Sequence, residues 1–264
     1  MTVLLGVAHG SRNDASQGVV RELLAEVMAA RPGLRAEAAY LDTATPSIAR
    51  AVAALVAEGT DDIVVLPLLL NAATHSKTDV AGSVQAARLA HPGLRLRYGR
   101  PFGAHPLVVE VLEQRLVEAG AATLPVVVAA GGSIDPDANA AVAATARLLW
   151  EGRAHPTVDY AFVSATGPRL PAALARVVGP VAVARLFLGP GYLPDQVAGL
   201  AGDAVVTDVL GPAPQLVRLV LERYDEALAG EVRMNCDACL YRIPFGGREQ
   251  QVGAAQLPHT HPDD

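Results

Sequence analysis

Short apolar runs alternate with amphipathic stretches along most of the chain. The apolar runs predict strands at residues 3–7, 36–41, 63–70, 94–98 and 126–130. The stretches between them place apolar residues at helical spacing, and they predict helices at residues 17–30, 47–58, 80–89 and 106–118. Uninterrupted apolar strands joined by helices are typical of buried parallel sheets. The pattern therefore predicts an α/β fold.

The same pattern then occurs a second time. Residues 9–11 (His-Gly-Ser) align with residues 131–133 (Gly-Gly-Ser), and residues 40–42 (Tyr-Leu-Asp) align with residues 162–164 (Phe-Val-Ser), both at a spacing of 122. This self-similarity indicates an internal duplication. We expect two duplicated Rossmann-like lobes with parallel sheets, at residues 1–121 and 122–229. Residues 230–264 form a tail outside the repeat.

Composition narrows the class of protein. Of 264 residues, 51% are hydrophobic, 18% are charged and 4% are aromatic, and the net charge is −6. These values exclude a disordered chain, and an acidic chain with few aromatic residues argues against nucleic-acid binding. No apolar run reaches the ~18 residues of a membrane span. The first residues lack the basic start of a secretory signal, so we expect a cytoplasmic protein rather than a two-lobed periplasmic binding protein.

Three polar residues follow strands of the first copy. His9 follows the first strand, Asp42 the second and His75 the third. Ligands of open α/β sheets bind at the carboxyl ends of strands, so we expect the three side chains to share one rim. The second copy has Gly131, Ser164 and, approximately, Leu193 at these places. It keeps the architecture without these groups, and we expect it to shape one wall of the cleft.

Simpler roles exist for the same residues. A histidine after a strand can be a loop hydrogen-bonder. Asp42 can cap the turn at Thr43, and Ser11 can cap the following helix. Convergence of two histidines and an aspartate on one lobe favours a functional site over these alternatives.

Four segments together resemble a known family. They are H-G-S at residues 9–11, Y-L-D-x-x-x-P-S at 40–47, L-P-L-L-L followed by H-x-x-x-D-V at 66–80, and F-G-A-H-P at 102–106. They resemble the sirohydrochlorin chelatases, the class II chelatases of the CbiX/SirB family, and the duplication matches its long two-lobed members. The resemblance implies insertion of Co²⁺ or Fe²⁺ into sirohydrochlorin without ATP, in cobalamin or siroheme biosynthesis. It also implies that His9 and His75 are the active-site histidines.

The chemistry of that reaction suits these residues. Metal insertion removes two pyrrole protons and strips the metal of water, and neutral imidazole can bind the metal and accept protons. We expect His9 and His75 to perform both tasks, with Asp42 orienting a histidine or accepting a proton. The substrate carries eight carboxylates. Ser11, Arg12 and Lys77 are the expected substrate contacts, and a solvated surface position is the alternative for the two cations.

The tail carries a separate signal. Cys236 and Cys239 form an M-x-C-x-x-C motif, and His259 and His261 lie near the end of the chain. Two thiolates need two more ligands for a closed site, and the tail resembles those of some long cobaltochelatases that are associated with an Fe–S centre. The alternative is a flexible tail with adventitious metal affinity.

The leading function is therefore a tetrapyrrole metal chelatase, a lyase. The alternative is a metal-binding or delivery protein that uses the Cys/His tail without tetrapyrrole catalysis. Cobalt and iron both suit His and Asp ligands, so the sequence leaves the metal open. Monomer and homodimer also both stay open.

Overall fold

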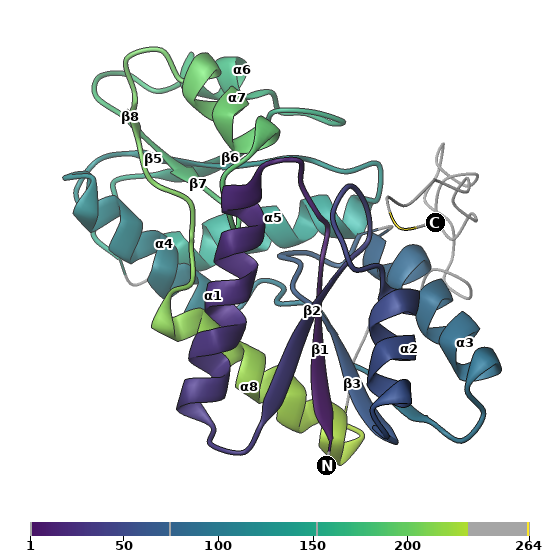
Figure 1. Ribbon diagram of the computed structural model, residues 1–264. Helices are drawn as coiled ribbons and strands as arrows, with labels where there is room; N and C mark the ends of the chain where they lie inside the picture. Colours follow the sequence, from purple (N-terminus) through teal and green to yellow (C-terminus); the bar gives the residue numbers. More distant parts are fainter. Residues whose placement is uncertain (1, 74, 152, 232–262, 264) are drawn as a thin grey trace.

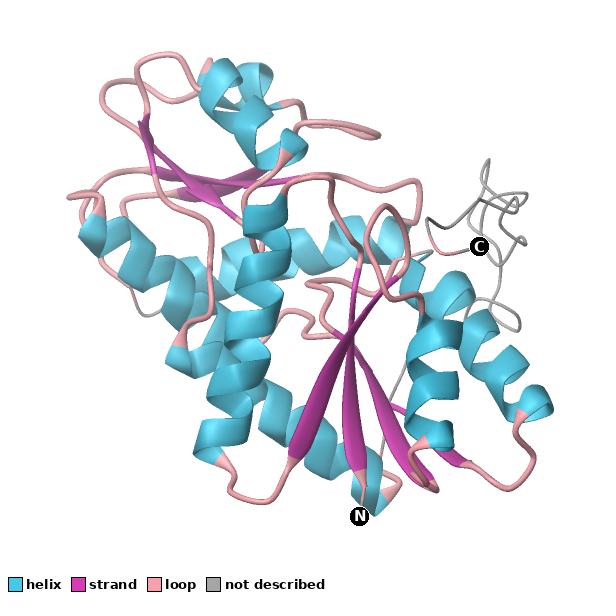
Figure 2. Ribbon diagram, in the orientation of Figure 1, coloured by secondary structure: helices cyan, strands magenta, loops and turns pink. Residues whose placement is uncertain are grey.

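The computed structural model describes residues 2–73, 75–151, 153–231 and 263, and these form two parallel β-sheets of four strands each (Figures 1 and 2). The sheets share one strand order, β2-β1-β3-β4 in the first and β6-β5-β7-β8 in the second. The strands are β1 (Val3–Ala8), β2 (Arg35–Tyr40), β3 (Asp62–Pro67), β4 (Arg95–Tyr98), β5 (Val126–Ala130), β6 (Val158–Phe162), β7 (Ala182–Arg185) and β8 (Val205–Val206). The predicted fold of two duplicated parallel sheets is confirmed.

Helices connect successive strands and cover the sheets. They are α1 (Asp14–Ala30), α2 (Ile48–Ala57), α3 (Ala81–Ala90), α4 (Pro106–Glu118), α5 (Pro136–Trp150), α6 (Leu170–Leu174), α7 (Tyr192–Leu200) and α8 (Pro214–Ala229), with one π-helical turn, η1 (His75–Val80). Helix α1 begins three residues earlier than predicted, because the side chain of Asn13 accepts a hydrogen bond from the backbone N–H of Ala15. Among the described residues, no helix is long and apolar enough to cross a membrane.

Strand β3 ends at Pro67 and does not continue to residue 70 as the apolar run predicts. After Leu68 donates a hydrogen bond to Val7, the chain turns out of the sheet. The carbonyls of Leu69 and Leu70 then accept hydrogen bonds from the loop before α4. This turn delivers three leucines, residues 68–70, to the space between the sheets.

The two copies exchange their last helices. Helix α4, the last of the first copy, packs against α5 and β7 of the second. Helix α8, the last of the second copy, packs against α1, β3 and β4 of the first (Figure 1). One hydrophobic core therefore runs through both copies, with Leu23 and Leu66 from the first and Val128 and Leu186 from the second. The expected boundary at 121/122 divides the sequence repeat, but each sheet is covered by a helix of the other copy.

Candidate active site

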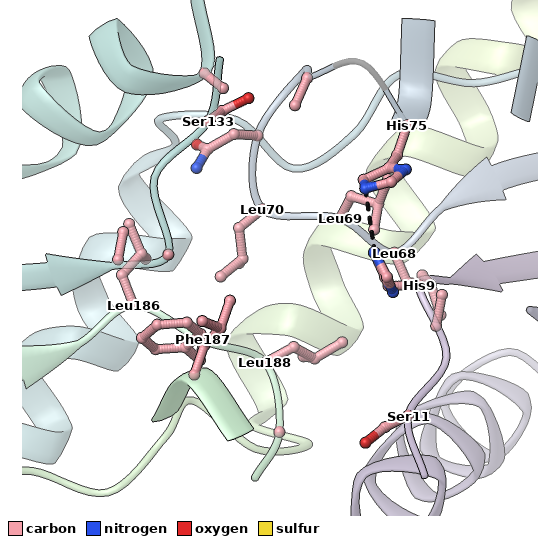
Figure 3. Close-up of a pocket in the computed structure, with 18 of the residues that line it drawn as sticks. His9, Ser11, Leu68, Leu69, Leu70, His75, Ser133, Leu186, Phe187 and Leu188 are labelled. Carbon is pink, nitrogen blue, oxygen red and sulfur yellow. Dashed lines mark hydrogen bonds between the residues drawn. The ribbon is translucent and has the colours of Figure 1, made fainter. Parts of the chain in front are cut away.

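A cleft of about 320 Å³ lies between the carboxyl ends of the two sheets (Figure 3). Both copies line it at equivalent loops, which follow β1 and β3 in the first copy and β5 and β7 in the second. The lining is mostly apolar, and its polar side chains are His9, Ser11, Ser16, Gln17, Tyr40, Asn71, His75, Ser133 and Asn139. The repeat thus places one shared cleft between two similar walls, at the sheet edge where α/β proteins bind their ligands.

The structure brings His9 and His75 together in this cleft. Their Nε2 atoms are 3.1 Å apart, and the rings meet edge to face with centroids 4.5 Å apart (Figure 3). Histidine nitrogens bind transition metals at about 2.1 Å. If both Nε2 atoms bound one ion at their present separation, the N–metal–N angle would be about 95°. Small movements of the rings therefore suffice for both to bind one ion.

Asp79 orients the His75 ring. The carboxylate Oδ2 lies 2.7 Å from His75 Nδ1, and the Asp79 side chain is only 7% exposed. With Nδ1–H donating to the carboxylate, neutral His75 presents an unprotonated Nε2 to the cleft, and His9 is then the donor between the rings. The spacing of four residues between His75 and Asp79 is visible in the sequence, but the predicted site does not include Asp79.

The surroundings in the cleft also change the pKa of His9. Shielding from bulk water by the cleft walls lowers the pKa of His9 below its ordinary 6.5, and the neighbouring His75 ring lowers it further. Contact with the Gly10 carbonyl and the charges of Asp42 and Asp79 oppose this shift without cancelling it. His9 is therefore neutral, and able to bind a metal or accept a proton, at pH 7.

Asp42 lies beside His9 but contacts neither imidazole by a hydrogen bond within the described residues. Its carboxylate accepts from the backbone N–H of Thr43, and its own N–H donates to the His9 carbonyl. A Cβ at Gly10 would lie 1.7 Å from the Asp42 carbonyl, so only glycine allows this close approach. The predicted orienting role belongs to Asp79 by geometry, because Asp42 is held in the turn.

Lys77 is not placed where substrate carboxylates can reach it, which corrects the expectation. Its side chain is 2% exposed, and its Nζ lies 2.8 Å from Asp135 and 2.7 Å from Asp137 of the second copy. The other two expected substrate contacts, Ser11 and Arg12, lie on the β1–α1 loop. Ser11 lines the cleft, whereas Arg12 is exposed and does not.

The second copy supplies an apolar wall. Gly131 stands at the position of His9, and a Cβ built on it would lie 3.2 Å from Leu193, so these two positions meet as the histidines do. Leu186, Phe187 and Leu188 face the cleft across from the leucines at residues 68–70 (Figure 3). Both three-residue segments accept hydrogen bonds from the loop before their copy's last helix.

Within the described residues, no cluster of three or more His, Cys, Asp or Glu side chains could hold a metal. Two imidazoles alone form an open site, which suits an ion that must leave the protein for another ligand. The tail residues Cys236, Cys239, His259 and His261 lie outside the described residues.

Sequence comparisons identify relatives along nearly the whole chain. The family model described as CbiX matches residues 3–119 and 125–227, which include both copies. The sirohydrochlorin cobaltochelatase of Priestia megaterium is 30% identical over 263 residues, covering 92% of this chain and 85% of that protein. The sirohydrochlorin ferrochelatase of Bacillus subtilis strain 168 is 32% identical over 167 residues, covering 62% of this chain and 64% of that protein.

Two solved SirB structures also resemble this chain along most of its length. SirB from Bacillus subtilis with Fe³⁺ has a TM-score of 0.77 at 26% identity, covering 87% of this chain and 96% of that chain. The sirohydrochlorin chelatase SirB from Bacillus subtilis subspecies spizizenii in complex with cobalt has a TM-score of 0.74 at 26% identity, covering 87% and 97%. Relatives named for cobalt and for iron thus both resemble this chain.

Proposed function

The chain belongs to the CbiX family, and from this premise we propose that it is a sirohydrochlorin chelatase, a lyase that inserts Co²⁺ or Fe²⁺ into sirohydrochlorin. The observation that carries the proposal is the His9–His75 pair, 3.1 Å apart in a cleft between two apolar walls. Relatives that act on the same tetrapyrrole support it over a metal-delivery protein.

We assign the imidazoles two successive tasks. Neutral His75 offers Nε2 to the incoming metal because Asp79 holds the proton of that ring on Nδ1. His9 binds the same ion through Nε2 once its proton has moved to Nδ1, which faces the Gly10 carbonyl at 3.4 Å. Two protein ligands replace part of the water shell and leave positions open for the pyrrole nitrogens.

Proton removal follows from the same geometry. As the ion passes to the macrocycle, each imidazole is released as a base beside a pyrrole N–H. The lowered pKa of His9 keeps this ring neutral before transfer, so that it can accept a pyrrole proton. The apolar walls suit the flat faces of a tetrapyrrole, and they leave its carboxylates to reach the rim, where Arg12 is exposed. Ser11 is the expected contact inside the cleft.

A direct metallation assay tests the function. Purified protein is mixed with sirohydrochlorin and Co²⁺, Fe²⁺ or Ni²⁺ without oxygen, and loss of the metal-free absorption spectrum is followed. We expect faster metallation than in protein-free solution for cobalt or iron. If no metal is inserted faster than without protein, the proposal is wrong.

For the tail we propose a metal or Fe–S site at Cys236, Cys239, His259 and His261, supported by the residue types and spacing alone. Removal of residues after 230 should abolish tail-bound iron or zinc but retain insertion by the cleft. Loss of metal binding with no insertion rate to lose would instead favour a delivery protein. Monomer and homodimer both suit this proposal, because one chain already forms the complete cleft.

A further inference from the structure

A buried ion-pair cluster joins the two copies beside His75. Lys77 lies two residues after His75 on η1, and its ammonium is enclosed between Asp135 and Asp137. The side chains are 2%, 7% and 22% exposed in that order. Burying a lysine is unfavourable unless its charge is compensated, and two carboxylates at hydrogen-bond distance provide that compensation.

The acidic residues are built into the opposite wall of the cleft. Asp135 caps α5, with Oδ1 accepting from the N–H of Asp137 while Oδ2 faces Lys77. The N–H of Asp135 in turn donates to Ser133, which lines the cleft. A continuous chain of polar contacts therefore runs from the His75 turn into the loop of the second copy.

Among the described residues, no ion pair joins the copies at the equivalent place on the other side of the pseudo-symmetric interface. Asn13 and Ala15 stand where the second copy has Asp135 and Asp137, 122 residues later. There the copies meet through small residues, since a Cβ at Gly189 would lie 3.4 Å from Ser16 Oγ and one at Gly191 would lie 3.7 Å from Ser11 Oγ. Only the side that carries His75 has a lysine, because Lys77 is the sole lysine of the chain.

We propose that Lys77, with Asp135 and Asp137, is a positioning device that fixes the His75 turn against the second copy and so sets the distance between His75 and His9. The inference rests on the proposed function for its catalytic consequence, but not for its structural one. Lys77 is thus a positioning residue rather than a substrate contact. The second copy contributes to the metal site through two carboxylates that touch neither metal nor substrate.

Asp137→Asn tests the proposal with a milder change than removal of Lys77. The matched control is Glu113→Gln, because Glu113 pairs at 2.9 Å with the fully buried His155 and is 25% exposed, against 22% for Asp137. Co²⁺ alone is titrated into each full-length protein, and its visible absorption reports the ligands. We expect Asp137→Asn to weaken Co²⁺ binding about fivefold or more, to change the spectrum, and to lower kcat, with Glu113→Gln like the parent.

The single lysine provides a second measurement. Acetic anhydride labels one ε-amine in this chain, and mass spectrometry gives its rate. We expect Lys77 to react far more slowly in the native parent and in Glu113→Gln than in the urea-unfolded chain, and to lose this protection in Asp137→Asn. Labelling at the unfolded rate in the native parent would overturn the proposal.

An Asp137→Asn protein with the same Co²⁺ affinity and visible spectrum as Glu113→Gln would also overturn the proposal. The two measurements separate this inference from the proposed function. If the parent inserts no metal but shows both effects, the function fails and the positioning device stands. If the parent inserts metal and neither effect occurs, the function stands and the positioning device fails.

Discussion

At the end of β1 the first copy places His9, whereas the second copy places Gly131 at the end of β5. Aligning the leucines at 68–70 with residues 186–188 likewise places Leu193 and Val197 where the first copy has His75 and Asp79. The second copy therefore has apolar side chains where the first has a polar pair, within a sheet of the same strand order. A duplicated fold can confine its chemistry to one copy because the other still supplies shape.

The largest difference between the copies should come from the histidines. His75→Ala or His9→Ala should lower the metallation rate about 100-fold or more, since each loses both a metal ligand and a proton acceptor. Leu193→Ala, at the position equivalent to His75, should retain most of the rate. Stopped-flow absorption of sirohydrochlorin with Co²⁺ measures all three. Equal losses for His75→Ala and Leu193→Ala would contradict a one-sided site.

Substitution of Asp79 should have the second-largest effect on metal binding or rate. Asp79→Asn removes the charge that holds the His75 proton on Nδ1, and we expect a loss of about 10- to 100-fold in metal affinity or rate. Asp42→Asn is the matched control, since its carboxylate bonds only to the Thr43 N–H within the described residues, and it should cost less. The order of the two losses in Co²⁺ titrations decides which carboxylate orients the ring, and a larger loss for Asp42→Asn would reverse our assignment.

The two apolar segments that line the cleft, residues 68–70 and 186–188, should contribute equally to substrate binding. Leu70 and Leu188 occupy equivalent positions on the two walls, with carbonyls bonded to Gly103 and Gly211. Leu70→Ala and Leu188→Ala should each raise the KM for sirohydrochlorin about fivefold, equivalent to about 1 kcal/mol, with kcat little changed. Steady-state kinetics at fixed Co²⁺ tests this. An effect at Leu70 alone would mean that the second copy does not face the macrocycle.

How much could be predicted from the sequence depends on how far apart the interacting residues lie along the chain. Alternating strands and helices, the repeat, and the strand-end positions of His9 and His75 are local patterns, and they predicted the fold and the convergence of the two rings. The Asp79 contact was also local, as a four-residue spacing on one turn, and could have been found.

Other features depend on long-range packing. The burial of Lys77 depends on Asp135 and Asp137 in the other copy, and nothing near residue 77 indicates such partners. Exchange of α4 and α8 is equally hidden, because an amphipathic helix has the same pattern whichever sheet it covers. The π-helical form of residues 75–80 likewise has no signal in the periodicity.

The smallest expected difference is in titration. The pKa of His9 is lowered first by shielding from water in the cleft and then by the His75 ring. Imidazole NMR signals of the metal-free protein should titrate for His9 below 6.5 in the parent, and His75→Asn should move that midpoint toward 6.5. Gly131 gives the second copy no group to titrate at the equivalent position.

The lowered pKa of His9 should also make the stability of the folded protein depend on pH. A lowered pKa means that the unfolded chain binds the proton first as the pH falls below 6.5, so protonation favours unfolding. The contribution of neutral His9 is complete above 6.5 and is lost as the pH falls through the folded pKa. Urea unfolding of the parent and His9→Gln at several pH values should therefore show the parent losing stability relative to the variant on acidification. A constant difference would mean that His9 has the same pKa in both states, and that the cleft neither shields it nor places His75 close enough to affect it.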